Sequence, residues 1–151
     1  MESLKEHFER ERRLPPRQLS DEELAVLHHV LEHGPERAKS FLPQLLNVKA
    51  VRSCICGCPS IKLLADSTVP VGDTEGDRVL CDYEGRTASG ELVGVLLFQD
   101  GGKITELEVY SIDGEIQDPS GVFGGPLLAS LQMLEWEPLP GNPNIRVPKR
   151  P

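Results

Sequence analysis

The chain has 151 residues and a net charge of −8, with 24 acidic and 16 basic side chains. It contains no run of the roughly 18 apolar residues that a membrane-spanning helix needs, and its charged start (MESLKEHFERERR) lacks the apolar stretch of a secretory signal. We therefore expect a single domain in the cytoplasm, and the acidic charge argues against nucleic acid as a partner because it repels phosphate backbones.

Residues 1–19 are charged and end at Pro15 and Pro16, which block continuation of a helix. We interpret this segment as a charged N-terminal arm that packs on a neighbouring chain, and a homo-oligomer formed through it is one hypothesis. Its basic residues are interleaved with glutamates, which makes it a poor arm for nucleic acid. Residues 20–140 are predicted to form one domain, and residues 141–151 an extended C-terminal tail.

The first helix has the clearest start and stop signals. Ser20 is followed three residues later by Glu23, which is the pattern of a capping box, and Gly34 provides the stop. At 100° per residue, one stripe of this helix should face the core. The predicted stripe contains Leu24, Leu27, His28 and Leu31. His28 is thus expected to be a partly buried, hydrogen-bonded core residue, with a ligand or base as the alternative.

A second helical segment is predicted from Glu36 to Leu46, broken into two pieces or kinked by Pro43. Three strands are predicted after this helical segment and before residue 92. Their expected ranges are 48–55, 61–65 and 78–83, with a loop at 66–77 and a short helix much later at 126–134.

The stretch Leu92 to Ser111 predicts a central β-hairpin with its turn at Asp100-Gly101-Gly102. Its first strand is apolar at consecutive positions, so we expect a covering layer on both faces. Its second strand alternates, which places Leu107 and Val109 on the core side. The sequence therefore predicts an α+β fold, with N-terminal helices packed on a mainly antiparallel, meander-like sheet of about five strands.

The negative charge is concentrated in this sheet region. Residues 60–120 contain 13 acidic and four basic side chains. A solvated surface is the simplest explanation, and a docking face for a basic protein partner is the alternative that suggests a function. The candidate partner-binding residues are those that alternate away from the core on the last strand: Glu106, Glu108 and Tyr110. A small cytoplasmic binding protein, of an immunity or inhibitor type, is our first functional hypothesis.

Four cysteines form the second candidate site. Cys54, Cys56 and Cys58 alternate, so in an extended backbone their side chains point the same way, and Cys81 lies on a later predicted strand. Four thiolates can hold zinc, although structural zinc sites favour cysteines separated by two to four residues. A metal-binding or thiol-redox protein is therefore the alternative function. Reduced structural cysteines are the simpler reading, because a cytosolic chain disfavours disulfides.

No stretch has a recognisable catalytic signature. The glycines at 121–125 do not join a strand to a helix as a phosphate loop does, and no serine sits in a nucleophile elbow. We expect a binding protein rather than an enzyme, and no cofactor apart from the zinc alternative.

Two stretches of the chain resemble sequences of other proteins: CICGCPSIKL and VGVLLFQDGGKITELEVYS. The turn Cys56-Gly57-Cys58-Pro59 and the later hairpin resemble a group of short bacterial proteins of uncharacterised function. The resemblance covers roughly residues 50–112, and it implies helical material before a sheet. It implies no activity, and Cys54 and Cys81 lie outside its pattern.

Overall fold

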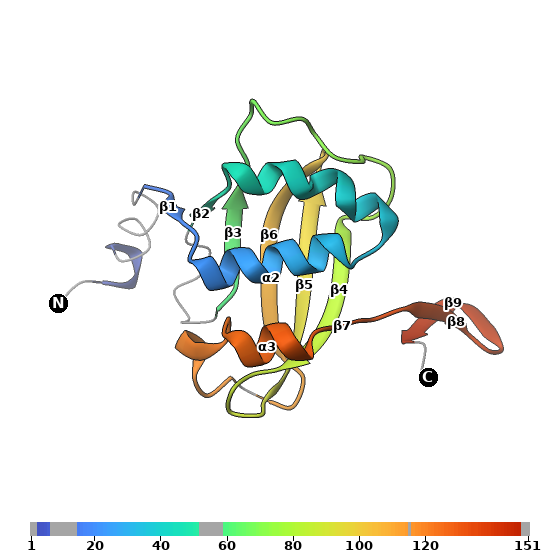
Figure 1. The fold of residues 1–151 in the computed structure, drawn as a ribbon. Coiled ribbons are helices and arrows are strands. Elements are labelled where there is room, and N and C mark those ends of the chain that lie inside the picture. The colour runs from blue at the N-terminus through green and yellow to red at the C-terminus, as the bar shows by residue number, and fades with distance from the viewer. Residues whose placement is uncertain (1–2, 7–14, 52–58, 115, 149–151) are drawn as a thin grey trace.

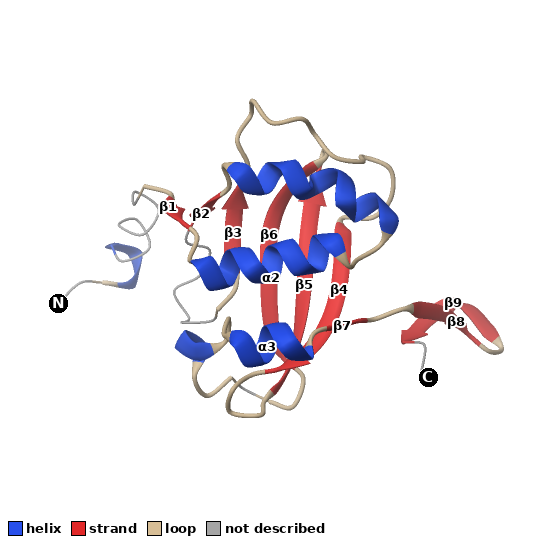
Figure 2. Cartoon of the chain, viewed as in Figure 1, coloured by secondary structure: helices blue, strands red, loops and turns tan. Residues whose placement is uncertain are grey.

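The computed structural model describes residues 3–6, 15–51, 59–114 and 116–148. Within these ranges the core is a seven-stranded sheet whose neighbouring strands are all antiparallel, with helices on one face (Figure 1, Figure 2). The predicted α+β class is therefore confirmed. Across the sheet the strands are β1 (Arg17–Gln18), β2 (Lys49–Val51), β3 (Ile61–Leu64), β6 (Lys103–Ser111), β5 (Leu92–Asp100), β4 (Val79–Arg86) and β7 (Gln132–Met133).

The hairpin of β5 and β6 lies at the centre of the sheet, as the sequence predicts. Its turn residues Gly101 and Gly102 have φ angles of 60° and 84°, which glycine adopts without steric cost and which two-residue hairpin loops require. Leu97 is paired with Leu107 across the two strands, and both side chains are fully buried. Val109 is buried as well, so the predicted core side of β6 is confirmed.

The order of the strands differs from a simple meander. β4, β5 and β6 follow one another as hairpins, but β3 lies beside β6, with Ile61 paired to Leu107. The loop of residues 65–78 therefore crosses the end of the sheet from β3 to β4, which is a Greek-key arrangement (Figure 1). Five strands were predicted close to where they occur, and the prediction missed the two-residue edge strands β1 and β7.

Two buried glutamines hold this end of the sheet together. The Gln44 side chain donates from Nε2 to the carbonyl of Gly102 at 2.7 Å, and its Oε1 accepts from the amide of Ile104 at 3.0 Å. The Gln99 side chain donates to the carbonyl of Asp77 at 3.0 Å and accepts from the amide of Gly102 at 3.1 Å. Both side chains thus bond to backbone groups of the crossing loop, the turn and the start of β6.

Helix α2 (Asp21–Glu32) begins at the predicted capping box. The Ser20 hydroxyl accepts from the Glu23 amide at 3.1 Å, and the Glu23 carboxylate accepts from the Ser20 amide at 2.8 Å. Arg17 donates to both oxygens of the same carboxylate, each at 2.9 Å. Burial raises the pKa of the Glu23 carboxyl, but these hydrogen bonds outweigh it, and the pKa lies below its ordinary value. Arg17 thus contacts the first turn of α2, and β1 is paired with β2 at the edge of the sheet.

The buried side of α2 is rotated relative to the predicted stripe and contains Glu23, Val26, Leu27, Val30 and Leu31. His28 was predicted to lie among core residues, and that prediction is wrong: its ring is exposed, with Nδ1 3.1 Å from the Glu32 carboxylate. His29 is half-buried instead, stacked on His33 and edge-on to Tyr83. Burial, with a smaller contribution from His33, lowers the pKa of His29.

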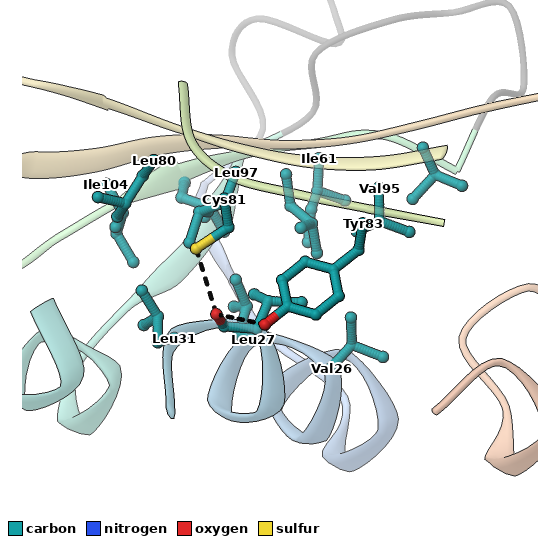
Figure 3. Packing of buried hydrophobic residues seen from close by; sticks show 14 of the residues in the cluster. Val26, Leu27, Leu31, Ile61, Leu80, Cys81, Tyr83, Val95, Leu97 and Ile104 are labelled. Carbon is teal, nitrogen blue, oxygen red and sulfur yellow. Dashed lines mark hydrogen bonds between the residues drawn. The ribbon is translucent and has the colours of Figure 1, made fainter. Parts of the chain in front are cut away.

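The end of α2 is joined to β4 through one shared acceptor. The carbonyl of Val30 is among the last four of the helix, and it accepts from the Cys81 thiol and from the Tyr83 hydroxyl, each at 3.2 Å (Figure 3). A Cβ added at Gly34 would lie 2.5 Å from that oxygen and 3.1 Å from the Cys81 sulfur. Glycine at this position therefore lets the chain leave the helix close against β4.

Further helical elements lie beside α2 on the same face of the sheet (Figure 2). The 3-10 helix η1 (Glu36–Leu46) runs through Pro43 as one element, where the sequence predicted two pieces or a kink, and it buries Phe41 against the core. The short η2 (Pro119–Gly121) precedes α3 (Gly125–Ser130), which buries Leu127.

The C-terminal residues form a separate two-stranded sheet. β8 (Trp136–Leu139) pairs with β9 (Asn142–Pro148) around a turn at Gly141, whose φ is 85°. This hairpin projects from the side of the domain where β7 lies (Figure 1). The described part of the predicted extended tail is thus one strand of a hairpin.

Candidate functional site

One face of the sheet has no helix over it in the part of the chain that the structure describes (Figure 2). Because side chains alternate along a strand, residues between the core positions of β4, β5 and β6 point to this side. The second layer predicted over β5 is thus not seen on this face within the described residues. The apolar residues of β5 that point to this face are half-buried. We call the following seven residues the open face: Asp82, Glu84, Leu96, Phe98, Glu106, Glu108 and Tyr110.

Tyr110 forms the aromatic part of the open face. It is paired with Gly94 across the hairpin, and its ring lies so close to that glycine that any Cβ there would overlap the ring. The ring thus covers a bare stretch of β5 backbone and leaves 38% of the residue exposed. Gly94 therefore makes the room in which the tyrosine lies flat.

Carboxylates surround this ring. Burial raises the pKa of the Tyr110 hydroxyl, and the charges of Asp82, Glu108 and Glu84 raise it further. These three side chains come from two strands on either side of β5, and they act on one phenol because they share the face. Glu106 is on the same side of β6, paired with Phe98 on one side and with Lys62 on the other.

Asp82 links the open face to the C-terminal hairpin. Its Oδ2 accepts from the indole N–H of Trp136 at 2.8 Å. Its Oδ1 is shielded from solvent and has no hydrogen-bond partner within the described residues. Burial raises the pKa of Asp82, the hydrogen bond from Trp136 opposes this, and Glu84 adds to the increase. The indole thus covers one carboxylate at the β4 side of the open face.

The predicted partner-binding residues Glu106, Glu108 and Tyr110 therefore lie together, as the alternation of β6 requires. Sequence reasoning missed Asp82 and Glu84, although both belong to the alternating run of β4, and it missed the contact from Trp136, which is distant in the chain. Chemically, carboxylates grouped around an aromatic ring suit ammonium and guanidinium groups.

The cysteine hypothesis is tested only at Cys81. Cys54, Cys56 and Cys58 lie outside the described residues, so their convergence and zinc binding stay predictions. Cys81 is 2% exposed on the helix-facing side of β4, and burial raises the pKa of its thiol to about 12. Such a thiol is a poor metal ligand or nucleophile, because both roles require the thiolate. Among the described residues no group of three or more histidine, cysteine or acidic side chains is placed to hold a metal ion.

Comparison with known proteins gave no match to a protein family, to a curated protein or to a solved structure. The resemblance of residues 50–112 to a group of bacterial proteins therefore stays a prediction. No helix among the described residues is long and apolar enough to cross a membrane.

Proposed function

We propose that this protein is a small binding protein whose open face binds a basic segment of a partner protein. The observation that carries the proposal is the composition of that face: four carboxylates, the exposed ring of Tyr110 and the half-buried side chains of Leu96 and Phe98 on one uncovered side of the sheet. Interfaces commonly combine an aromatic and apolar centre with charged groups around it. Inhibition of a basic protein is one form that such binding would take.

The charge of the face defines the chemistry of the partner. Carboxylates on neighbouring strands attract lysine and arginine side chains and repel phosphate groups, so a basic protein segment fits where nucleic acid does not. Charge pairs at an exposed surface are screened by salt, and steering by charge acts mainly on the rate of association. Binding through this face should therefore weaken as the salt concentration rises.

The test is to select binders from a random peptide library on the immobilised protein. We expect the selected peptides to be rich in lysine and arginine, and to lose binding to the double variant Glu106→Lys, Glu108→Lys. The matched control is Glu32→Lys, Glu36→Lys, which makes the same change of charge on the opposite, helical side, where both side chains are exposed. Peptides without basic residues, or equal binding to both double variants, would refute the proposal.

A further inference from the structure

The open face already contains one arginine placed on an aromatic ring. The guanidinium carbon of Arg78 lies 5.9 Å from the centre of the Phe98 ring, within the range of a cation–π contact. Phe98 is paired with Glu106 across the hairpin, so an acidic side chain is its cross-strand neighbour. On this side of the sheet, an aromatic ring next to a carboxylate therefore accommodates a guanidinium group.

Tyr110 offers a second ring of this kind, on the same side of the hairpin but further from its turn. The ring atoms nearest to a Cβ built on Gly94 are Cζ and Cε1, together with the hydroxyl oxygen, so the ring leans across β5 towards β4. The residue of β4 that pairs with Gly94 is Glu84. Glu108 precedes Tyr110 by two residues and points to the same side of β6. The ring therefore has one glutamate towards β4 and another beside it on its own strand.

Basic side chains around the open face have neighbours other than this ring. Arg86 is on the same side of β4, and its guanidinium donates to the carbonyl of Gly90 at 2.9 Å, in the turn between β4 and β5. Lys62 on β3 is paired with Glu106, and Lys49 lies one strand further away on β2. These cations therefore lie at other parts of the face.

The two glutamates at the ring are free to bind a cation. Within the described residues, neither the Glu84 nor the Glu108 side chain takes part in a hydrogen bond or an ion pair. Neighbouring strands lie about 4.8 Å apart, and alternate residues of one strand about 6.8 Å apart. A cation on the exposed side of the Tyr110 ring is therefore within reach of both flexible carboxylates.

We infer that Tyr110, Glu84 and Glu108 bind the guanidinium group of an arginine in the basic segment of the partner. This inference rests on the proposed function of the open face and specifies which basic residue that face selects. Arginine stacks its planar guanidinium on an aromatic ring and donates in a fork to carboxylates. The ammonium group of lysine is compact and more strongly hydrated, so it gains less from the ring. The face should therefore prefer arginine to lysine.

The experiment compares two fluorescein-labelled peptides of equal charge, hexa-arginine and hexa-lysine. Fluorescence anisotropy measures their affinity for the full-length protein at about 0.1 M salt, where charges more than about 10 Å apart are largely screened. We expect hexa-arginine to bind the wild type about tenfold more tightly than hexa-lysine. Tyr110→Leu should abolish this preference, because it weakens hexa-arginine binding and changes hexa-lysine binding by about twofold or less. Tyr110→Phe should retain it, because the ring remains.

Matched variants test whether the preference belongs to this ring. Phe98→Leu removes the other aromatic side chain of the face, which already carries an arginine of the chain itself, so the preference should stay unchanged. Glu84→Gln, Glu108→Gln should weaken hexa-arginine binding more than Glu32→Gln, Glu36→Gln, which removes two charges from exposed positions on the helical side. Circular dichroism of each variant checks that it is folded.

A measurement on the wild type keeps the test decisive if Tyr110→Leu does not fold. The chain has two tyrosines, and the other one, Tyr83, is buried, so the ring signals of Tyr110 can be assigned in an NMR spectrum. Hexa-arginine should shift these signals, and hexa-lysine at the same saturation should shift them less.

The outcomes separate this inference from the proposed function. Equal affinity for the two peptides, or a preference that survives Tyr110→Leu, would overturn the arginine site and leave the binding of basic segments standing. Tyr110 ring signals that stay in place at saturating hexa-arginine would have the same meaning. Binding of neither peptide would overturn both proposals.

Discussion

Gln44 offers the sharpest test of how this fold is held together. Its side chain is 1% exposed, and it satisfies the carbonyl of Gly102 and the amide of Ile104 at the turn of the central hairpin. Methionine has a similar length and no polar group that can replace the amide. The substitution Gln44→Met therefore removes both hydrogen bonds and leaves the packing volume almost unchanged.

The structure shows which of the two lost bonds matters more. The carbonyl of Gly102 keeps a second donor, the amide of Gly72 at 2.7 Å. The amide of Ile104 donates to Gln44 Oε1 at 3.0 Å, and leaving a buried amide unsatisfied costs about 1–3 kcal/mol. We therefore expect the free energy of unfolding to fall by about 2 kcal/mol, which for a chain of this size lowers Tm by about 4–8 °C.

Urea and thermal unfolding followed by circular dichroism measure this change. Fluorescence is the weaker probe, because the single tryptophan, Trp136, is exposed in the C-terminal hairpin. The control is Gln132→Met on β7, whose side chain is exposed, with an expected change of about 0.5 kcal/mol or less. Faster hydrogen exchange of the Ile104 amide should accompany the loss. If Gln44→Met is as stable as the control, the assigned role of this side chain is wrong.

Two further predictions concern the contact between α2 and β4. Gly34→Ala should lower the free energy of unfolding by about 1–3 kcal/mol, because the added methyl group meets the Val30 carbonyl. Tyr83→Phe should lower it by only about 0.5–1.5 kcal/mol, because Cys81 still donates to that oxygen. Urea unfolding of the two variants tests this order. At about pH 8, Cys81 should not react with a thiol reagent until urea unfolds the chain, because a pKa raised to about 12 keeps the thiol protonated. If purified protein contains zinc, Cys81→Ala should leave the zinc content unchanged by elemental analysis, and loss of the metal would reinstate the four-cysteine site.

The sequence predicted those parts of the fold that are determined locally. The capping box of Ser20 and Glu23 and the glycine turn of the central hairpin were both located, because each depends on residues a few positions apart. The outward side of β6 was located for the same reason, since alternation alone places Glu106 and Glu108 together.

Features that depend on distant contacts were not predicted. The placement of β3 beside β6 follows from the crossing loop, which has no local signal. The stripe of α2 was misplaced because apolar residues occupy half of that helix, and because the burial of Glu23 depends on its pairing with Arg17 from outside the helix. The link between Asp82 and Trp136 joins residues 54 positions apart and shows no pattern in the sequence.

The Greek-key position of β3 divides folding into a local and a non-local step. The three strands β4, β5 and β6 follow one another through short connections, so they can pair early. β3 must then close the long loop before Ile61 can meet Leu107, and pairings between distant segments form slowly because loop closure costs entropy. Until that happens, β6 is an edge strand with open amides and carbonyls, which is the kind of surface on which folding chains aggregate. The pairing of β3 with β6 therefore completes the core and also covers the edge that β6 would otherwise leave open.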